Sequence, residues 1–134
     1  MTPELFWLTL TMLLAATMWL PFIIGVNTTE SGQQVTKDGR ANIPEMVPWV
    51  QRANRAHLNL VEQAMPFAAL VLLAHVLDVT SGVTVGAAIA FFWLRLAHAV
   101  FMITSANQIP IRPIIFTLAW LCPMAVGIEI LRLV

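Results

Sequence analysis

Hydrophobic residues along this chain fall into four long runs, separated by short polar connections. The runs cover residues 5–26, 58–77, 83–105 and 114–131. Each is close to the roughly 20 helical residues needed to cross a hydrocarbon layer of about 30 Å. The pattern predicts an all-α integral membrane protein, in which a single domain over residues 1–134 forms a bundle of four transmembrane helices.

Polar residues at the start of the second run follow a helical period. At 100° per residue, four of them fall within an arc of roughly 80°; they are Arg52, Arg55, Asn59 and Glu62. Ionisable groups inside hydrocarbon are costly and are kept mostly where they bind something. The stripe therefore predicts a ligand site. The alternative is that the arginines anchor the helix at the headgroups, while Asn59 and Glu62 bond to neighbouring helices.

The third run carries a second polar face, formed by Arg95, His98, Met102 and Ser105. Arg95 lies near the middle of its run, where an arginine needs a partner or a wet cavity. Glu62 is the expected partner, since both side chains belong to the same half of the bundle. For His98 two hypotheses stay open, a hydrogen bond between helices or membership of a polar cavity shared with Arg95.

Composition supports a membrane protein and excludes other classes. The chain is 59% apolar and 10% charged, whereas a soluble domain carries about 25% charged residues. The formal net charge is zero, so nothing predicts binding to nucleic acid. Cys122 is the single cysteine, which excludes an internal disulfide and a thiolate metal cluster. No metal site is expected.

The distribution of Lys and Arg predicts the orientation. The connection over residues 27–57 contains four of these residues and the connection over 106–113 contains Arg112, whereas residues 78–82 contain none. Basic connections face the cytoplasm, so both termini are predicted to lie on the other side. Within the first connection, the Ser31–Gln34 and Lys37–Arg40 segments are typical of turns or loops.

Two short motifs resemble the MAPEG family (membrane-associated proteins in eicosanoid and glutathione metabolism). The string RAHLN at residues 55–59, followed by Glu62 and by Pro66-Phe67, is similar to the family's second-helix signature. The string RLAH at residues 95–98 is similar to its third-helix motif. The resemblance covers essentially the whole chain. It is closest to the microsomal glutathione transferase branch and its small bacterial relatives, which implies a bacterial inner membrane.

The resemblance implies a homotrimer that binds glutathione as co-substrate between neighbouring subunits. The second substrate would be a lipophilic electrophile or hydroperoxide that enters from the membrane lipid. Arg95 would be catalytic by favouring the glutathione thiolate. The residues implied to bind or support the tripeptide are Arg52, Arg55, His57, Asn59, Glu62, His98 and Arg112.

The chain departs from the family pattern at two positions. It contains no tyrosine, and Met102 stands where active members usually place one. Asn54 replaces an arginine of the closest relatives. The leading hypothesis is a glutathione transferase or peroxidase. The alternative is a non-catalytic MAPEG-fold protein or partner subunit with a vestigial cavity. A small exporter ranks last, because the first run holds no acidic residue beyond Glu4 at its edge.

Overall fold

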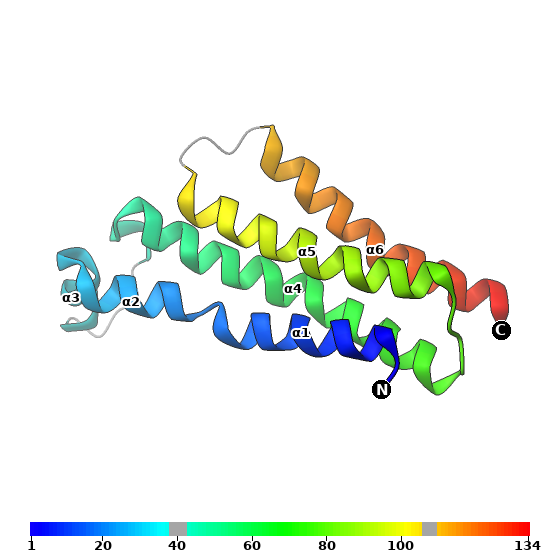
Figure 1. Ribbon diagram of the computed structural model, residues 1–134. Helices are drawn as coiled ribbons and strands as arrows, with labels where there is room; N and C mark the ends of the chain where they lie inside the picture. Colours follow the sequence, from blue (N-terminus) through cyan, green and yellow to red (C-terminus); the bar gives the residue numbers. More distant parts are fainter. Residues whose placement is uncertain (38–42, 106–109) are drawn as a thin grey trace.

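The structure is a computed structural model that describes residues 1–37, 43–105 and 110–134. Within these ranges, four helical segments are long and apolar enough to cross a membrane; they are Pro3–Thr28, Pro48–Val76, Gly82–Thr104 and Ile111–Leu133. Successive segments run antiparallel in one elongated bundle (Figure 1). The predicted all-α bundle of four spans is therefore confirmed.

The first span is divided into two helices, α1 (Pro3–Thr17) and α2 (Leu20–Thr28), where the sequence predicted one. Pro21 has no backbone N–H and cannot donate to the carbonyl one turn earlier, so the helical ladder is interrupted there. The Thr17 hydroxyl instead donates to the Leu13 and Leu14 carbonyls, at 2.9 and 3.1 Å. The chain keeps nearly the same direction through the break (Figure 1).

The segment after α2 forms a helix where turns were expected. Helix α3 (Glu30–Lys37) covers the Ser31–Gln34 segment, so that prediction was wrong. The Thr29 hydroxyl accepts a hydrogen bond from the Gly32 N–H at 3.2 Å, which satisfies one free donor of the first turn. Of the second expected turn, Lys37 ends α3 and residues 38–40 lie outside the described residues.

Helix α4 (Pro48–Val76) is longer than the apolar run over 58–77 that predicted it. Its 29 residues extend for about 44 Å at 1.5 Å per residue, more than a hydrocarbon layer of about 30 Å. Pro48 stands at the first helical turn, where a missing N–H costs nothing. A short 3-10 helix, η1 (Ile43–Glu45), precedes α4. The arginines of the predicted stripe thus lie on a regular helix whose first turns extend beyond the apolar layer.

Helix α2 packs closely against the start of α4. A Cβ atom added at Gly25 would collide with the Val50 side chain and meet Trp49 at 2.9 Å. Val50 is fully buried and packs with Met46 in a small cluster beside α2. Glycine at position 25 therefore permits the approach of the two helices next to the arginine stripe.

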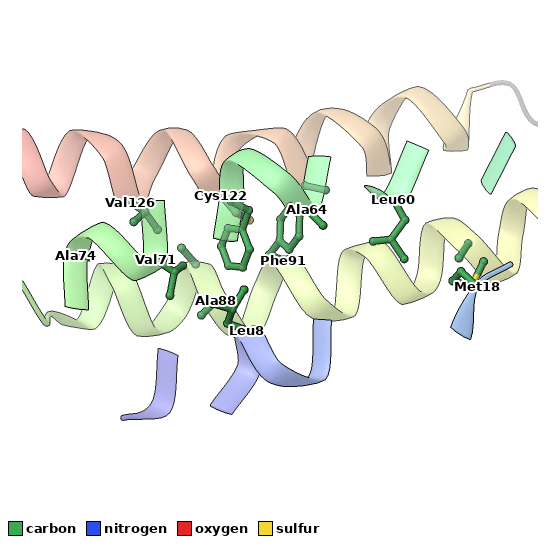
Figure 2. Close-up of a cluster of buried hydrophobic side chains, with 14 of the residues drawn as sticks. Leu8, Met18, Leu60, Ala64, Val71, Ala74, Ala88, Phe91, Cys122 and Val126 are labelled. Atoms are coloured by element: carbon green, nitrogen blue, oxygen red, sulfur yellow. The ribbon is translucent and has the colours of Figure 1, made fainter. Parts of the chain in front are cut away.

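The main core fills the space between α1, α4, α5 (Gly82–Thr104) and α6 (Ile111–Leu133). Figure 2 shows side chains from these helices meeting in one cluster, with Phe91 near its middle and Leu60 on the side toward Met18. Phe91 stacks on Phe67 with ring centroids 4.0 Å apart. Small buried residues such as Ala88 let the helices approach closely. This packing fixes the rotation of α4 against α5, and so decides which polar side chains can meet.

Candidate functional site

The predicted polar residues belong to the first half of α4, the second half of α5 and the first turn of α6. Arg52 connects two of these helices, because its Nε and Nη2 both donate to the carbonyl oxygen of Ile103 at 3.4 Å. That carbonyl belongs to the last turn of α5, where backbone acceptors lack helical donors. In the isolated protomer Arg52 therefore caps the C-terminal end of α5, where a positive charge is favourable.

The next residues of the stripe differ in their surroundings. The Asn59 amide nitrogen donates to the Arg55 carbonyl at 2.7 Å, within the same helix. The Arg55 side chain is exposed. His57 is half-buried, and its Nδ1 atom is buried without a hydrogen-bond partner in the described part of the chain. Arg55 and His57 thus keep binding capacity that the protomer's described contacts do not use.

Arg95 is fully buried, although arginine is almost never buried without a partner. Its Nη1 donates to the Oε1 atom of Gln63 at 3.1 Å. Its Nε and Nη2 have no hydrogen-bond partner among residues 1–37, 43–105 and 110–134. The expected partner, Glu62, is exposed and acts on Arg95 only as a nearby charge. The neighbouring amide, and not the carboxylate, therefore makes the direct contact.

His98 lies one turn after Arg95 and is also fully buried. Neither ring nitrogen has a hydrogen-bond partner within the described residues, while the ring packs near Phe116 at 6.1 Å between centroids. The charges of Arg95 and Arg112 both act on it electrostatically. We call Gln63, Arg95 and His98 the polar cluster. Buried polar groups are normally hydrogen-bonded, so several unused nitrogens in one place indicate a site that something else completes.

A cavity of about 220 Å³ lies beside the polar cluster, between α4 and α6. Its wall is formed by Glu62, Gln63, Pro66, Phe116, Trp120, Pro123 and Met124. Gln63 is the member of the polar cluster that reaches this wall, whereas Arg95 and His98 do not line this cavity. Pockets for drug-sized ligands occupy about 300–1,000 Å³, so this cavity alone offers less room than such a ligand needs.

A second cavity, of about 360 Å³, adjoins the first along α6. The two share Pro123 and Met124. Its other lining residues are all apolar: Leu70, Leu73, Gly127, Ile128, Ile130 and Leu131. An apolar groove therefore leads along α4 and α6 to the cavity beside the polar cluster.

Sequence reasoning missed Gln63, although it accepts the hydrogen bond that Arg95 donates to a side chain in the described structure. It lies just outside the helical arc of the stripe, next to Glu62. The signal available was an uncharged amide inside an apolar run, which is weaker than a charge. Met102, also expected on this face, is buried beside the core. In the described part of the chain, no group of His, Cys, Asp and Glu could hold a metal ion.

Comparison with models of protein families shows which family the chain belongs to. The model of the MAPEG family matches residues 6–132. The chain belongs to the MAPEG family. A search of curated proteins found no match. The matched range includes both polar stripes of this MAPEG protein and its four apolar helices, so it is an integral membrane protein. The family contains glutathione transferases and peroxidases as well as non-catalytic members.

Proposed function

We propose that this MAPEG protein binds glutathione and uses it as co-substrate in a transferase or peroxidase reaction on lipophilic substrates. The observation that supports it best is Arg95, a buried cation with two nitrogens that no described residue bonds. A hydrogen-bond acceptor from outside the protomer, best of all an anion, would stabilise this incompletely paired guanidinium. Glutathione offers two carboxylates and an ionisable thiol. Its single ammonium can donate a hydrogen bond to Glu62, which lines the cavity between α4 and α6.

The site residues divide by charge in this proposal. Arg52, Arg55 and Arg112 bind the carboxylates, since guanidinium groups match carboxylates well. His57, Asn59 and His98 support the tripeptide and the side chains around it. Arg95 is the catalytic residue. A thiol has a pKa of about 8.5, and a permanent positive charge close to it favours the thiolate, which is the nucleophile.

The groove along α4 and α6 supports a lipophilic second substrate. It is apolar along its whole wall and ends at the cavity lined by Glu62 and Gln63. An electrophile or a lipid hydroperoxide can enter it from the bilayer and present its reactive end to the thiolate. Turnover of lipid hydroperoxides or hydrophobic electrophiles by purified protein tests the activity. Binding of glutathione without any turnover would contradict it.

A second candidate function predicts glutathione binding without turnover. Met102 is buried at the position where active family members are expected to place a tyrosine hydroxyl, and the chain has no tyrosine. A thioether donates no hydrogen bond. This supports a non-catalytic MAPEG protein or partner subunit that keeps a ligand cavity.

We propose a homotrimer with the site between neighbouring protomers. The support is the small volume of the cavity and the exposure of Glu62 in its wall, which leaves part of the ligand for another subunit to cover. Arg55, on the same helix, is exposed as well. Native mass spectrometry from detergent should show three chains as the main species. A stable monomer or dimer would contradict the assembly.

We propose a multi-pass protein of a bacterial inner membrane, with both termini on the non-cytoplasmic side. The support is the excess of Lys and Arg in the first and third connections. Cysteines at exposed positions 33 and 80 of a Cys122→Ala protein test it. An impermeant thiol reagent added to cells with a permeabilised outer membrane should label position 80 and spare position 33. The reverse pattern would contradict the orientation.

A further inference from the structure

The hydrogen bond between Arg95 and Gln63 fixes which way the Gln63 amide points. A guanidinium group has only donors, so the atom that it contacts must be the amide oxygen. That oxygen lies 3.1 Å from Arg95 Nη1. The amide nitrogen, Nε2, takes no part in this contact. It is buried and has no hydrogen-bond partner within the described residues.

Gln63 also stands between the polar cluster and the open space. It is buried, yet it contributes to the wall of the cavity between α4 and α6, whereas Arg95 and His98 do not. Two other residues of this wall can form hydrogen bonds: Glu62, whose carboxylate can only accept when it is ionised, and Trp120, an exposed side chain with one indole N–H. Among the described residues that line this cavity, Gln63 therefore carries the buried donor that no hydrogen bond uses.

We propose that Nε2 of Gln63 donates a hydrogen bond to the anionic atom of the ligand, while Arg95 holds the amide in place and adds positive charge beside it. The inference rests on the function proposed above, and the anionic atom is then the glutathione sulfur. Ionisation of the thiol releases its proton to water, and no covalent bond forms between the protein and the sulfur.

The arrangement suits a developing anion for two reasons. A donor held in place before the ligand arrives needs no reorganisation when charge appears. The oxygen of the same amide is polarised by the guanidinium, which strengthens the bond that its N–H makes. Gln63 and Arg95 thus act as one unit, in which the amide contacts the sulfur and the cation supplies the charge.

Gln63→Met tests the donor, because methionine has a similar length and no N–H. The ultraviolet absorbance of the thiolate is followed against pH in protein saturated with glutathione. A hydrogen bond to a charged acceptor contributes enough to shift the thiol pKa by about one to two pH units. The pKa of bound glutathione is therefore expected to rise by about that much. A merely structural role would change the melting temperature without moving this pKa.

Gln63→Glu provides the second variant, since a carboxylate keeps an acceptor for Arg95 and so preserves the contact between α4 and α5. It lacks the donor and adds negative charge, so the thiol pKa should rise at least as much. Met65→Leu, at an exposed position of α4, is the matched control and should leave the pKa unchanged. An unchanged pKa in either folded Gln63 variant would overturn the inference while the unsubstituted protein still binds glutathione. No glutathione binding by the unsubstituted protein would overturn the proposed function itself.

Discussion

Replacing Arg95 with methionine is expected to weaken glutathione binding by about 2–5 kcal/mol, the usual effect of removing one partner from a buried, hydrogen-bonded charge pair. The fold should tolerate the change. Arg95 is fully buried, and in the described structure its Nε and Nη2 have no hydrogen-bond partner. Removing an incompletely paired buried charge offsets much of the contact that Gln63 loses. Calorimetric titration gives the dissociation constant, and thermal unfolding in detergent gives the stability.

Arg132→Met is the matched control, with the opposite expected pattern. Arg132 is exposed and donates to the buried carboxylate of Glu129 at 3.1 Å. Its removal leaves that carboxylate unpaired and should lower stability by about 1–3 kcal/mol, with glutathione binding unchanged. If Arg95→Met binds glutathione as tightly as the unsubstituted protein, Arg95 is a structural residue and no part of the ligand site.

Replacing Glu62 with glutamine is expected to weaken glutathione binding about tenfold to a hundredfold, since hydrogen bonds to charged groups contribute about 1.5–3 kcal/mol. Glu62 is exposed on the protomer and lines the cavity, so the melting temperature of the ligand-free protein should stay the same. Calorimetry with glutathione and with a glutathione analogue that lacks the amino group separates two effects. One is loss of the contact between the Glu62 carboxylate and the ammonium, and the other is a general loss of the ability to bind the ligand.

The analogue should bind the unsubstituted protein and Glu62→Gln with equal affinity, because it has no ammonium for the carboxylate to accept. Glu30→Gln, at an exposed position of α3, is the control for loss of one negative charge. If Glu62→Gln weakens the analogue as much as glutathione, Glu62 does not bind the ammonium.

The apolar runs predicted the four membrane-spanning segments correctly because the length of such a segment depends on little besides bilayer thickness. The same rule could not locate the start of α4, which extends to Pro48 through residues that lie outside the apolar run. Composition also could not show that Ser31–Gln34 would be helical. That helix begins with a cap, the hydrogen bond from the Gly32 N–H to the Thr29 hydroxyl, which composition does not reveal.

The polar stripes were harder to predict in detail than the helices. Periodicity shows which residues share a face, but it does not give the rotation of one helix against another. Glu62 and Gln63 differ by 100° around α4, and close packing decides that Gln63 meets Arg95. Periodicity likewise gave Arg52 a place in a ligand site, and could not reveal that it also bonds the Ile103 carbonyl at the end of α5.

Calorimetric titration of the purified, detergent-solubilised protein with glutathione tests the central proposal most directly. Saturable binding with a dissociation constant in the micromolar-to-millimolar range is predicted, and the same titration of Arg95→Met should show a large loss of affinity. A folded protein that gives no binding heat even at high millimolar glutathione would contradict the proposal that Arg95, Glu62 and the cavity beside them form a glutathione site.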